Sequence, residues 1–138
     1  MGVARTPAPE DMRALGPTAG LPLFVYGTLQ DAGFTARLLE RSIEIEPARL
    51  LDFELLRLES LAYPTVFDAP GEVVGGGLCR GLTAEDYERL DAYEGVHEGL
   101  YVRIEAHAVA GEVGSRGDPE PVFVYVVTEK TLRRYGAL

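Results

Sequence analysis

Strand-like segments fill most of the chain after its first twenty residues. They are short, rich in β-branched and aromatic residues, and separated by glycine, proline and charged residues, as the strands of a small sheet usually are. Between Ile43 and Glu59 apolar and charged residues alternate, which predicts one or two strands with one face in water and Pro47 at an edge or a bulge. The segments span residues 23–26, 43–59, 62–67, 73–82, 101–109 and 121–128.

Glycines and two helices complete the expected architecture. The run Gly75-Gly76-Gly77 lies inside a strand-like segment and lacks the Lys-Ser/Thr of a phosphate-binding loop, so it predicts a bend or bulge. Helices are expected over Thr35–Ser42 and from Thr83, a capping residue, to Glu94, before Gly95. Together these features predict an α+β domain built on a bent or closed antiparallel sheet.

Length, charge and cysteine content limit the possible classes of protein. The chain has 138 residues, enough for one domain, which we expect over residues 21–138 behind a flexible tail at residues 1–20. A formal net charge of −9 disfavours nucleic acid as a partner. Without an apolar run of roughly 20 residues or a secretory signal, we expect a cytoplasmic protein with no membrane contact. The single cysteine, Cys79, excludes an intramolecular disulfide and is most simply a core residue.

The first strand-like segment ends in an unusual way, at Tyr26-Gly27-Thr28-Leu29. Gly27 has no Cβ, so a ligand could approach the backbone closely at this point. The N–H groups of Gly27, Thr28 and Leu29 could then hold a carboxylate or a developing oxyanion. The alternative is a buried strand that ends in an ordinary turn.

The helix over residues 83–94 carries an acid on its apolar face. Tyr87 and Leu90 mark the face that packs on the core, and Glu94 lies seven positions after Tyr87 and four after Leu90, on the same face. Burial and the negative end of the helix dipole both raise the pKa of such a carboxyl group. The sequence leaves two roles open for Glu94, a rim residue paired with an arginine or a general base that works near neutral pH.

Two motifs in this order resemble those of the γ-glutamylcyclotransferase and AIG2-like family. They are FVYGTL at residues 24–29 and LDAYEG at residues 90–95, followed by Tyr101-Val102-Arg103. Tyr63-Pro64 also fits, and the similarity extends from about Leu21 to Val127. The resemblance implies a small mixed, mostly antiparallel β-barrel with two or more short helices and a cavity at one end.

The resemblance also implies a reaction and a set of site residues. Family members cyclise a γ-glutamyl or ε-linked glutamyl amine or peptide to 5-oxoproline and release the amine, without a metal or cofactor. Glu94 would be the catalytic acid and base, with Tyr101 lining the pocket. The substrate-binding loop would consist of Tyr26, Gly27, Thr28 and Leu29. One departure from the family is Gly77, where many relatives carry a larger or acidic residue, which would reshape one wall of the pocket.

Two functional classes fit these motifs. The first is an enzyme acting on a small γ-glutamyl substrate, and the second is a non-catalytic small-molecule binding protein that keeps the same cavity. His97, Glu98 and His107 are the residues most like metal ligands, but their spacing matches no common zinc signature. The sequence does not indicate the leaving amine or the oligomeric state.

Overall fold

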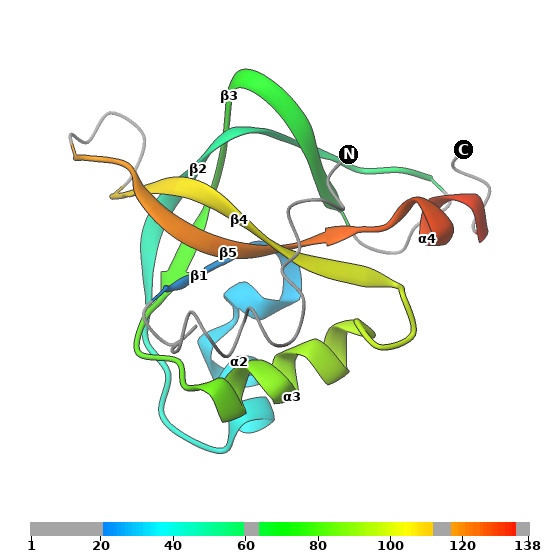
Figure 1. Cartoon of the computed structure of the whole chain (residues 1–138). Helices are drawn as coiled ribbons and strands as arrows, with labels where there is room; N and C mark the ends of the chain where they lie inside the picture. The colour runs from blue at the N-terminus through cyan, green and yellow to red at the C-terminus, as the bar shows by residue number, and fades with distance from the viewer. Residues whose placement is uncertain (1–20, 60–63, 112–116, 135–138) are drawn as a thin grey trace.

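The computed structural model describes residues 21–59, 64–111 and 117–134 of the chain. Its strands form a closed barrel in the order β1-β3-β2-β4-β5, and the barrel lies above α2 and α3 in Figure 1. The predicted tail at residues 1–20 and the predicted Tyr63 fall outside the described residues. In chain order the elements are β1 (Leu23–Val25), the 3-10 helix η3 (Gly27–Gln30), α2 (Ala32–Leu39), β2 (Ile45–Leu56), β3 (Thr65–Cys79), α3 (Ala84–Glu94), β4 (Tyr101–Ala110), β5 (Glu120–Val127) and α4 (Glu129–Arg134).

Strand β1 is short but closes the barrel. It pairs antiparallel with β3 and parallel with β5, where Leu23 is opposite Phe123. The remaining pairs, β2 with β3, β2 with β4 and β4 with β5, are antiparallel. The barrel is therefore mixed and mostly antiparallel, as predicted.

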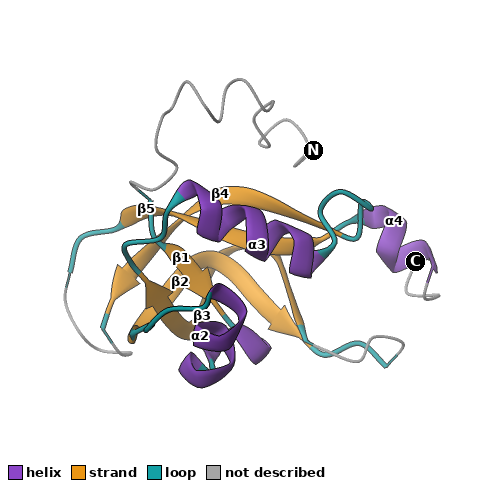
Figure 2. Ribbon diagram, turned by 90° about the horizontal axis from the view of Figure 1, so that it is seen from below, coloured by secondary structure: helices purple, strands orange, loops and turns teal. Residues whose placement is uncertain are grey.

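The core has two layers, and β1 lies between them. Phe24 points into the barrel interior with Leu50 and Val124, whereas Leu23 and Val25 point to the layer that packs against the helices. Both faces of β1 are thus covered, which explains why its residues are apolar without alternation. Figure 2 shows α2 and α3 as separate helices beside the strands, with α3 running along the barrel.

Several predicted boundaries differ from those of the structure. Helix α2 begins at Ala32, before the predicted Thr35, because the side chain of Asp31 accepts a hydrogen bond from the N–H of Phe34 and caps the helix. The helix ends at Leu39, before the predicted Ser42, where Glu40 takes a left-handed conformation with φ 59°. The C-terminal helix α4 was not predicted.

The long strands β2 and β3 are each continuous. The register of β2 against β3 shifts between Leu51 and Phe53, at Asp52, and not at Pro47, where a bulge was one expectation. Pro47 lies one residue outside the β2–β4 pairing, which fits the edge position that was the other expectation for it. Asp52 has φ 67°, and its carboxylate accepts a hydrogen bond from the N–H of Gly71 at 2.9 Å. The segments predicted separately over residues 62–67 and 73–82 contribute to one strand, β3, which runs from Thr65 to Cys79.

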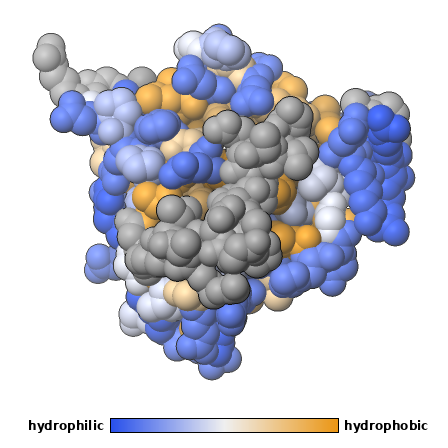
Figure 3. All heavy atoms as spheres, in the orientation of Figure 1, coloured by the Kyte–Doolittle hydropathy of each residue, from blue (hydrophilic) through white to orange (hydrophobic). Residues whose placement is uncertain are grey.

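Hydrophilic residues cover much of the face shown in Figure 3, with hydrophobic side chains visible between them. Large hydrophobic side chains that are exposed in the described part of the chain include Leu55 and Leu56 at the end of β2, Val73 on β3 and Tyr93 on α3. Within that part, no helix has the length and apolar content needed to cross a membrane.

Candidate active site

Helix α3 brings Glu94 to one end of the barrel. The hydroxyl of Thr83 accepts a hydrogen bond from the N–H of Asp86, and the carboxylate of Asp86 accepts one from the N–H of Thr83, which together form a capping box. The helix ends at Glu94, before Gly95 in a left-handed conformation with φ 71°. The sequence predicted both ends of this helix correctly.

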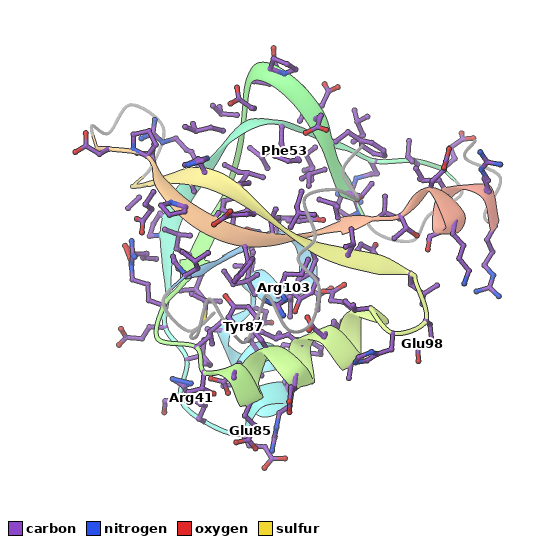
Figure 4. The ribbon with its side chains drawn as sticks, viewed as in Figure 1. Arg41, Phe53, Glu85, Tyr87, Glu98 and Arg103 are labelled. Carbon is purple, nitrogen blue, oxygen red and sulfur yellow. The ribbon has the colours of Figure 1, made fainter. Side chains whose placement is uncertain are left out.

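The face of α3 that carries Glu94 packs on the barrel. Tyr87 and Leu90 are 1% and 0% exposed, and the hydroxyl of Tyr87 donates a hydrogen bond to the carbonyl of Leu21. Glu94 itself is partly buried, whereas Glu85 and Glu88 lie on the exposed face. Figure 4 shows the same polarity, with Tyr87 facing the strands and Glu85 directed away from them.

A cavity of about 310 Å³ opens beside Glu94. It is formed where the end of β1, the first turn of η3, the end of α3, the start of β4 and β5 come together. The residues that the sequence proposed as catalytic or substrate-binding, Glu94, Tyr101 and the Tyr26–Leu29 turn, all lie on its wall. The lining residues in the described part of the chain are Tyr26, Gly27, Thr28, Leu29, Pro64, Tyr93, Glu94, Leu100, Tyr101 and Tyr125.

Burial sets the acidity of Glu94. Removal from water raises the pKa of its carboxyl group to about 7, and the negative charge of Asp91, one helical turn earlier, adds to the effect. None of the ion pairs between described residues involves Glu94. Within the described part of the chain, Glu94 therefore has no arginine partner, unlike the rim glutamate that the sequence left open.

The end of β1 turns sharply into η3. Tyr26 is extended, and Gly27 then takes φ +72°, a conformation that favours glycine. In a 3-10 helix each N–H bonds the carbonyl three residues earlier, so the amides of Gly27 and Thr28 have no carbonyl partner within η3. The amide of Leu29, which the sequence also proposed, is used by the helix itself, in its bond to the carbonyl of Tyr26. The hydroxyl of Thr35 donates to the carbonyl of Leu29 at 2.9 Å and holds the turn against α2.

Tyrosine side chains form a large part of the cavity wall. The hydroxyl of Tyr26 donates a hydrogen bond of 2.5 Å to the backbone carbonyl of Tyr125. Burial raises the pKa of Tyr26 well above its usual range, and the nearby Tyr101 and Glu94 act in the same direction. Tyr26 is therefore neutral at physiological pH and acts as a hydrogen-bonding and packing group.

A cluster that the sequence did not identify lies behind this wall. The carboxylate of Asp91 accepts two hydrogen bonds from Arg103 on β4, each of 3.0 Å, and a third of 2.6 Å from the hydroxyl of Tyr125 on β5. Asp91 belongs to the LDAYEG motif, and its position three residues before Glu94 was the signal available in the sequence.

Other sequence candidates lie elsewhere. Gly77 is not on the cavity wall, contrary to the prediction; a Cβ at this position would lie 2.3 Å from Cγ2 of Ile45, so close packing of β3 on β2 requires the glycine. Burial raises the pKa of the Cys79 thiol to about 11, which suits a core residue. His97 and His107 are exposed, and no group of metal-binding side chains is present among the described residues.

Comparison with known proteins relates this chain to one family. The family model described as gamma-glutamyl cyclotransferase, AIG2-like, matches residues 23–137. AIG2-like protein A of Arabidopsis thaliana is 37% identical over 73 residues, which cover 53% of this chain and 44% of that protein. AIG2-like protein C of the same plant is 35% identical over 78 residues, 56% of this chain and 45% of that protein. The matched region thus spans less than half the length of these curated relatives.

Solved structures share the fold. The solution structure of an Arabidopsis thaliana protein superimposes with a TM-score of 0.67 at 30% identity, over 80% of this chain and 70% of that one. A structure described as a gamma-glutamyl cyclotransferase superimposes with a TM-score of 0.63 at 24% identity, over 78% of this chain and 66% of that one, and is similar in fold. From the family model, which covers most of the sequence, the chain belongs to the gamma-glutamyl cyclotransferase, AIG2-like family.

Proposed function

We propose that this protein is a cyclotransferase that converts a γ-glutamyl or ε-linked glutamyl amine or peptide to 5-oxoproline and a free amine. The observation that carries the proposal is the partly buried Glu94, whose pKa is raised to about 7, on the wall of a cavity that also contains the Tyr26–Leu29 turn. Family membership supports the same reaction class.

The cavity suits a small substrate that must fold on itself. Its volume of about 310 Å³ is at the lower end of the range for ligand sites. The amides of Gly27 and Thr28 would hold the α-carboxylate of the glutamyl group or the oxyanion that forms on its side-chain carbonyl. Because the nucleophile and the electrophile belong to one molecule, binding the ring-closing conformer supplies much of the catalysis.

The acidity of Glu94 matches the proton that must move. An α-ammonium group has a pKa near 8, and an unperturbed glutamate has one of about 4.3, a gap of roughly 5 kcal/mol at ~1.36 kcal/mol per pKa unit. With the pKa of Glu94 at about 7, the gap falls to about one unit, or roughly 1.4 kcal/mol. Glu94 can therefore accept the ammonium proton at neutral pH.

The reaction then proceeds in two balanced steps. Glu94 takes a proton from the substrate α-ammonium, and the free amine attacks the side-chain carbonyl carbon, which forms the lactam C–N bond and places negative charge on the carbonyl oxygen. As the tetrahedral intermediate collapses, the original amide C–N bond breaks, and the protonated Glu94 returns its proton to the departing nitrogen. The ring nitrogen, which carries two protons after its attack, passes the second one to the departing amine. The products are therefore 5-oxoproline and the amine in its ammonium form, and Glu94 is again a carboxylate.

A substrate screen tests the proposal. The full chain is incubated with γ-glutamyl amines, ε-(γ-glutamyl)lysine and γ-glutamyl peptides, and 5-oxoproline is measured by mass spectrometry, with binding of the same compounds measured by calorimetry. Release of 5-oxoproline from at least one compound, in proportion to enzyme concentration, is the expected result. Binding without release would support the alternative of a non-catalytic binding protein, and neither binding nor release would contradict both.

A further inference from the structure

The Asp91 cluster joins α3 to two strands of the barrel. Arg103 binds both carboxylate oxygens of Asp91, and the side chains are 10% and 16% exposed, so the pair is largely removed from water. Figure 4 shows Arg103 and Tyr87 in the space between α3 and the strands above it. Such a two-point contact between a guanidinium and a carboxylate fixes orientation as well as distance.

Arg103 depends on Asp91 for its charge compensation. Its guanidinium lies 4.4 Å from the ring centre of Tyr87 and 4.6 Å from that of Phe123, and its Nη1 atom has no hydrogen-bond partner among the described residues. The rings attract the cation, but the negative charge comes from Asp91. Removing either member would leave the other as a buried, uncompensated charge.

The cluster also reaches the cavity. Asp91 lies one helical turn before Glu94 on α3. Tyr125, which donates to Asp91 at 2.6 Å, lines the cavity and accepts the hydrogen bond of Tyr26 through its backbone carbonyl. The Asp91 carboxylate is thus connected to three cavity residues: Glu94 along α3, Tyr125 by a hydrogen bond, and Tyr26 through Tyr125.

We propose that Asp91 is a positioning residue for Glu94: clamped by Arg103 and Tyr125, it fixes the last turn of α3 at the cavity and holds a compensated negative charge one turn from the catalytic carboxyl group. This inference rests on the proposed function of Glu94. Burial raises the pKa of Glu94 most, and the charge of Asp91 adds to this effect. The charge of Arg103, paired with Asp91, should oppose it, so changes at either position should shift the pKa from the value that burial sets.

Tyrosine side chains from the neighbouring elements also face Glu94. Tyr26 at the end of β1, Tyr101 on β4 and Tyr125 on β5 face the cavity with Glu94. Burial raises the pKa of both Tyr26 and Tyr125 beyond the usual range, so these phenols carry no charge at neutral pH. Asp91 and its partner Arg103 are therefore the charged groups whose removal should move the titration of Glu94 most.

Substitutions at the two positions should move the titration in opposite directions. Asp91→Asn removes the negative charge and leaves Arg103 uncompensated, so Glu94 should titrate about one pH unit lower. Arg103→Gln leaves Asp91 uncompensated, so Glu94 should titrate about one pH unit higher. The double variant, with neither charge, should return the titration to between these values.

The measurement is carbon NMR of the Glu94 carboxyl signal across pH in the full chain, without substrate. Glu88→Gln, on the exposed face of α3, is the control and should leave the titration unchanged. Melting curves identify any variant that does not fold. In place of a variant that does not fold, Tyr125→Phe is measured. It removes the hydroxyl dipole that partly compensates the Asp91 charge, so Glu94 should feel that negative charge more strongly and its pKa should rise.

Shifts of opposite sign would support the proposal, and their absence, or shifts of the same sign, would show that Asp91 only holds the fold together. The titration needs no turnover, so it tests the role of Asp91 independently of the reaction. If no substrate releases 5-oxoproline, only the proposed reaction is contradicted. In an active enzyme, the rising limb of kcat/KM against pH should move with the NMR pKa of each variant, whereas a purely structural defect would lower the rate without moving the limb.

Discussion

At the scale of single residues, the position of Glu94 is costly for the fold when its carboxyl group is ionised. The folded state raises the pKa of Glu94 from 4.5 to about 7, so below pH 4.5 the protonated group costs little. As pH rises through 7, the folded state must bury the ionised form, and stability is lost. Active-site groups often trade stability for a suitable pKa in this way.

This cost predicts a pH-dependent effect of Glu94→Gln on stability. The amide does not ionise, so we expect the variant to be more stable than the unmodified protein at pH 8 by about 2 kcal/mol, and close to it at pH 4.5. Denaturant unfolding at both pH values measures the difference. Glu88→Gln on the exposed face of α3 should show no such pH-dependent gain; equal gains in both variants would contradict the raised pKa.

Gly27 tests whether the turn at the end of β1 binds a ligand. Its φ is +72°, and a Cβ added there would meet no protein atom within 4 Å, so Gly27→Ala should cost about 1 kcal/mol from backbone strain alone. If the amides of the turn hold the substrate, the new methyl group should obstruct it and reduce the affinity for a γ-glutamyl ligand at least tenfold.

The matched control is Gly71→Ala, which has a similar φ of +87° and equally open surroundings on the β2–β3 side of the barrel. It should lower the melting temperature to a similar extent and leave affinity unchanged. Calorimetric binding and thermal melting on both variants separate the effects. A loss of stability without a loss of affinity in Gly27→Ala would assign the glycine to the turn alone.

The sequence indicated Glu94, Tyr101 and the Tyr26–Leu29 turn, but not Leu100 or Tyr125, nor how the cavity residues are held. Glu94 could be predicted because a helix has a fixed period, and Gly27 because a strand that stops at glycine is locally unusual. Asp91 could not be assigned, since its partners Arg103 and Tyr125 come from β4 and β5, and only the tertiary fold brings them to the helix. For the same reason Gly77, where a Cβ would clash with Ile45 on β2, was wrongly expected to shape a wall of the pocket.

At the scale of secondary-structure elements, local signals decided which boundaries could be predicted. Helix α3 has a capping box at one end and a left-handed glycine at the other, both readable from the sequence. Helix α2 ends at Leu39 because the next residue, Glu40, takes a left-handed conformation. This conformation is uncommon for a residue other than glycine, so the end of the helix carries no signal in the sequence. The register of β2 shifts at Asp52, which has φ 67°, where glycine would be the usual choice, so no sequence signal marked this bulge.

Strand β3 should show a sharp difference between adjacent glycines. A Cβ at Gly76 would lie 2.4 Å from the carbonyl oxygen of Val25 and 2.6 Å from the ring of Phe24, whereas a Cβ at Gly75 would meet nothing within 4 Å. We expect Gly76→Ala to destabilise the protein by about 3 kcal/mol, because β1 cannot retreat without opening the barrel. Gly75→Ala should be neutral or slightly stabilising, since it reduces the entropy of the unfolded chain.

Chemical denaturation of the two variants measures this difference directly. Because the residues are neighbours in one strand and the substitution is the same, general effects of alanine on strand formation largely cancel. Equal stabilities would mean that β1 and β3 do not approach as closely as the structure shows.

At the scale of the whole molecule, barrel closure was the feature least accessible to sequence. The alternating segments predicted strands, and the glycines predicted curvature, but neither specifies that β1 lies parallel to β5 while pairing antiparallel with β3. That pairing joins residues about a hundred positions apart in sequence, and the contact of Leu23 with Phe123 has no local signal. The family resemblance, carried by the motifs at residues 24–29 and 90–95, supplied what periodicity could not.

Closure also explains how the site is built. The end of β1 can face the end of α3 only because β1 completes the barrel and α3 packs across it, through the layer that contains Val25, Tyr87 and Leu90. The cavity is therefore a property of the complete domain, and each of its walls belongs to a different element. Loss of any element that lines the cavity should abolish it.

The central claim, that Glu94 transfers the proton in ring closure, is tested most directly by the rate of 5-oxoproline release from Glu94→Gln. With the best substrate of the screen, we expect turnover to fall by about 10²–10⁴-fold while the affinity for that substrate changes by less than about threefold, because the amide is nearly isosteric but cannot accept the proton. The control Glu88→Gln should retain full turnover. Turnover by Glu94→Gln at the rate of the unmodified protein would contradict the account.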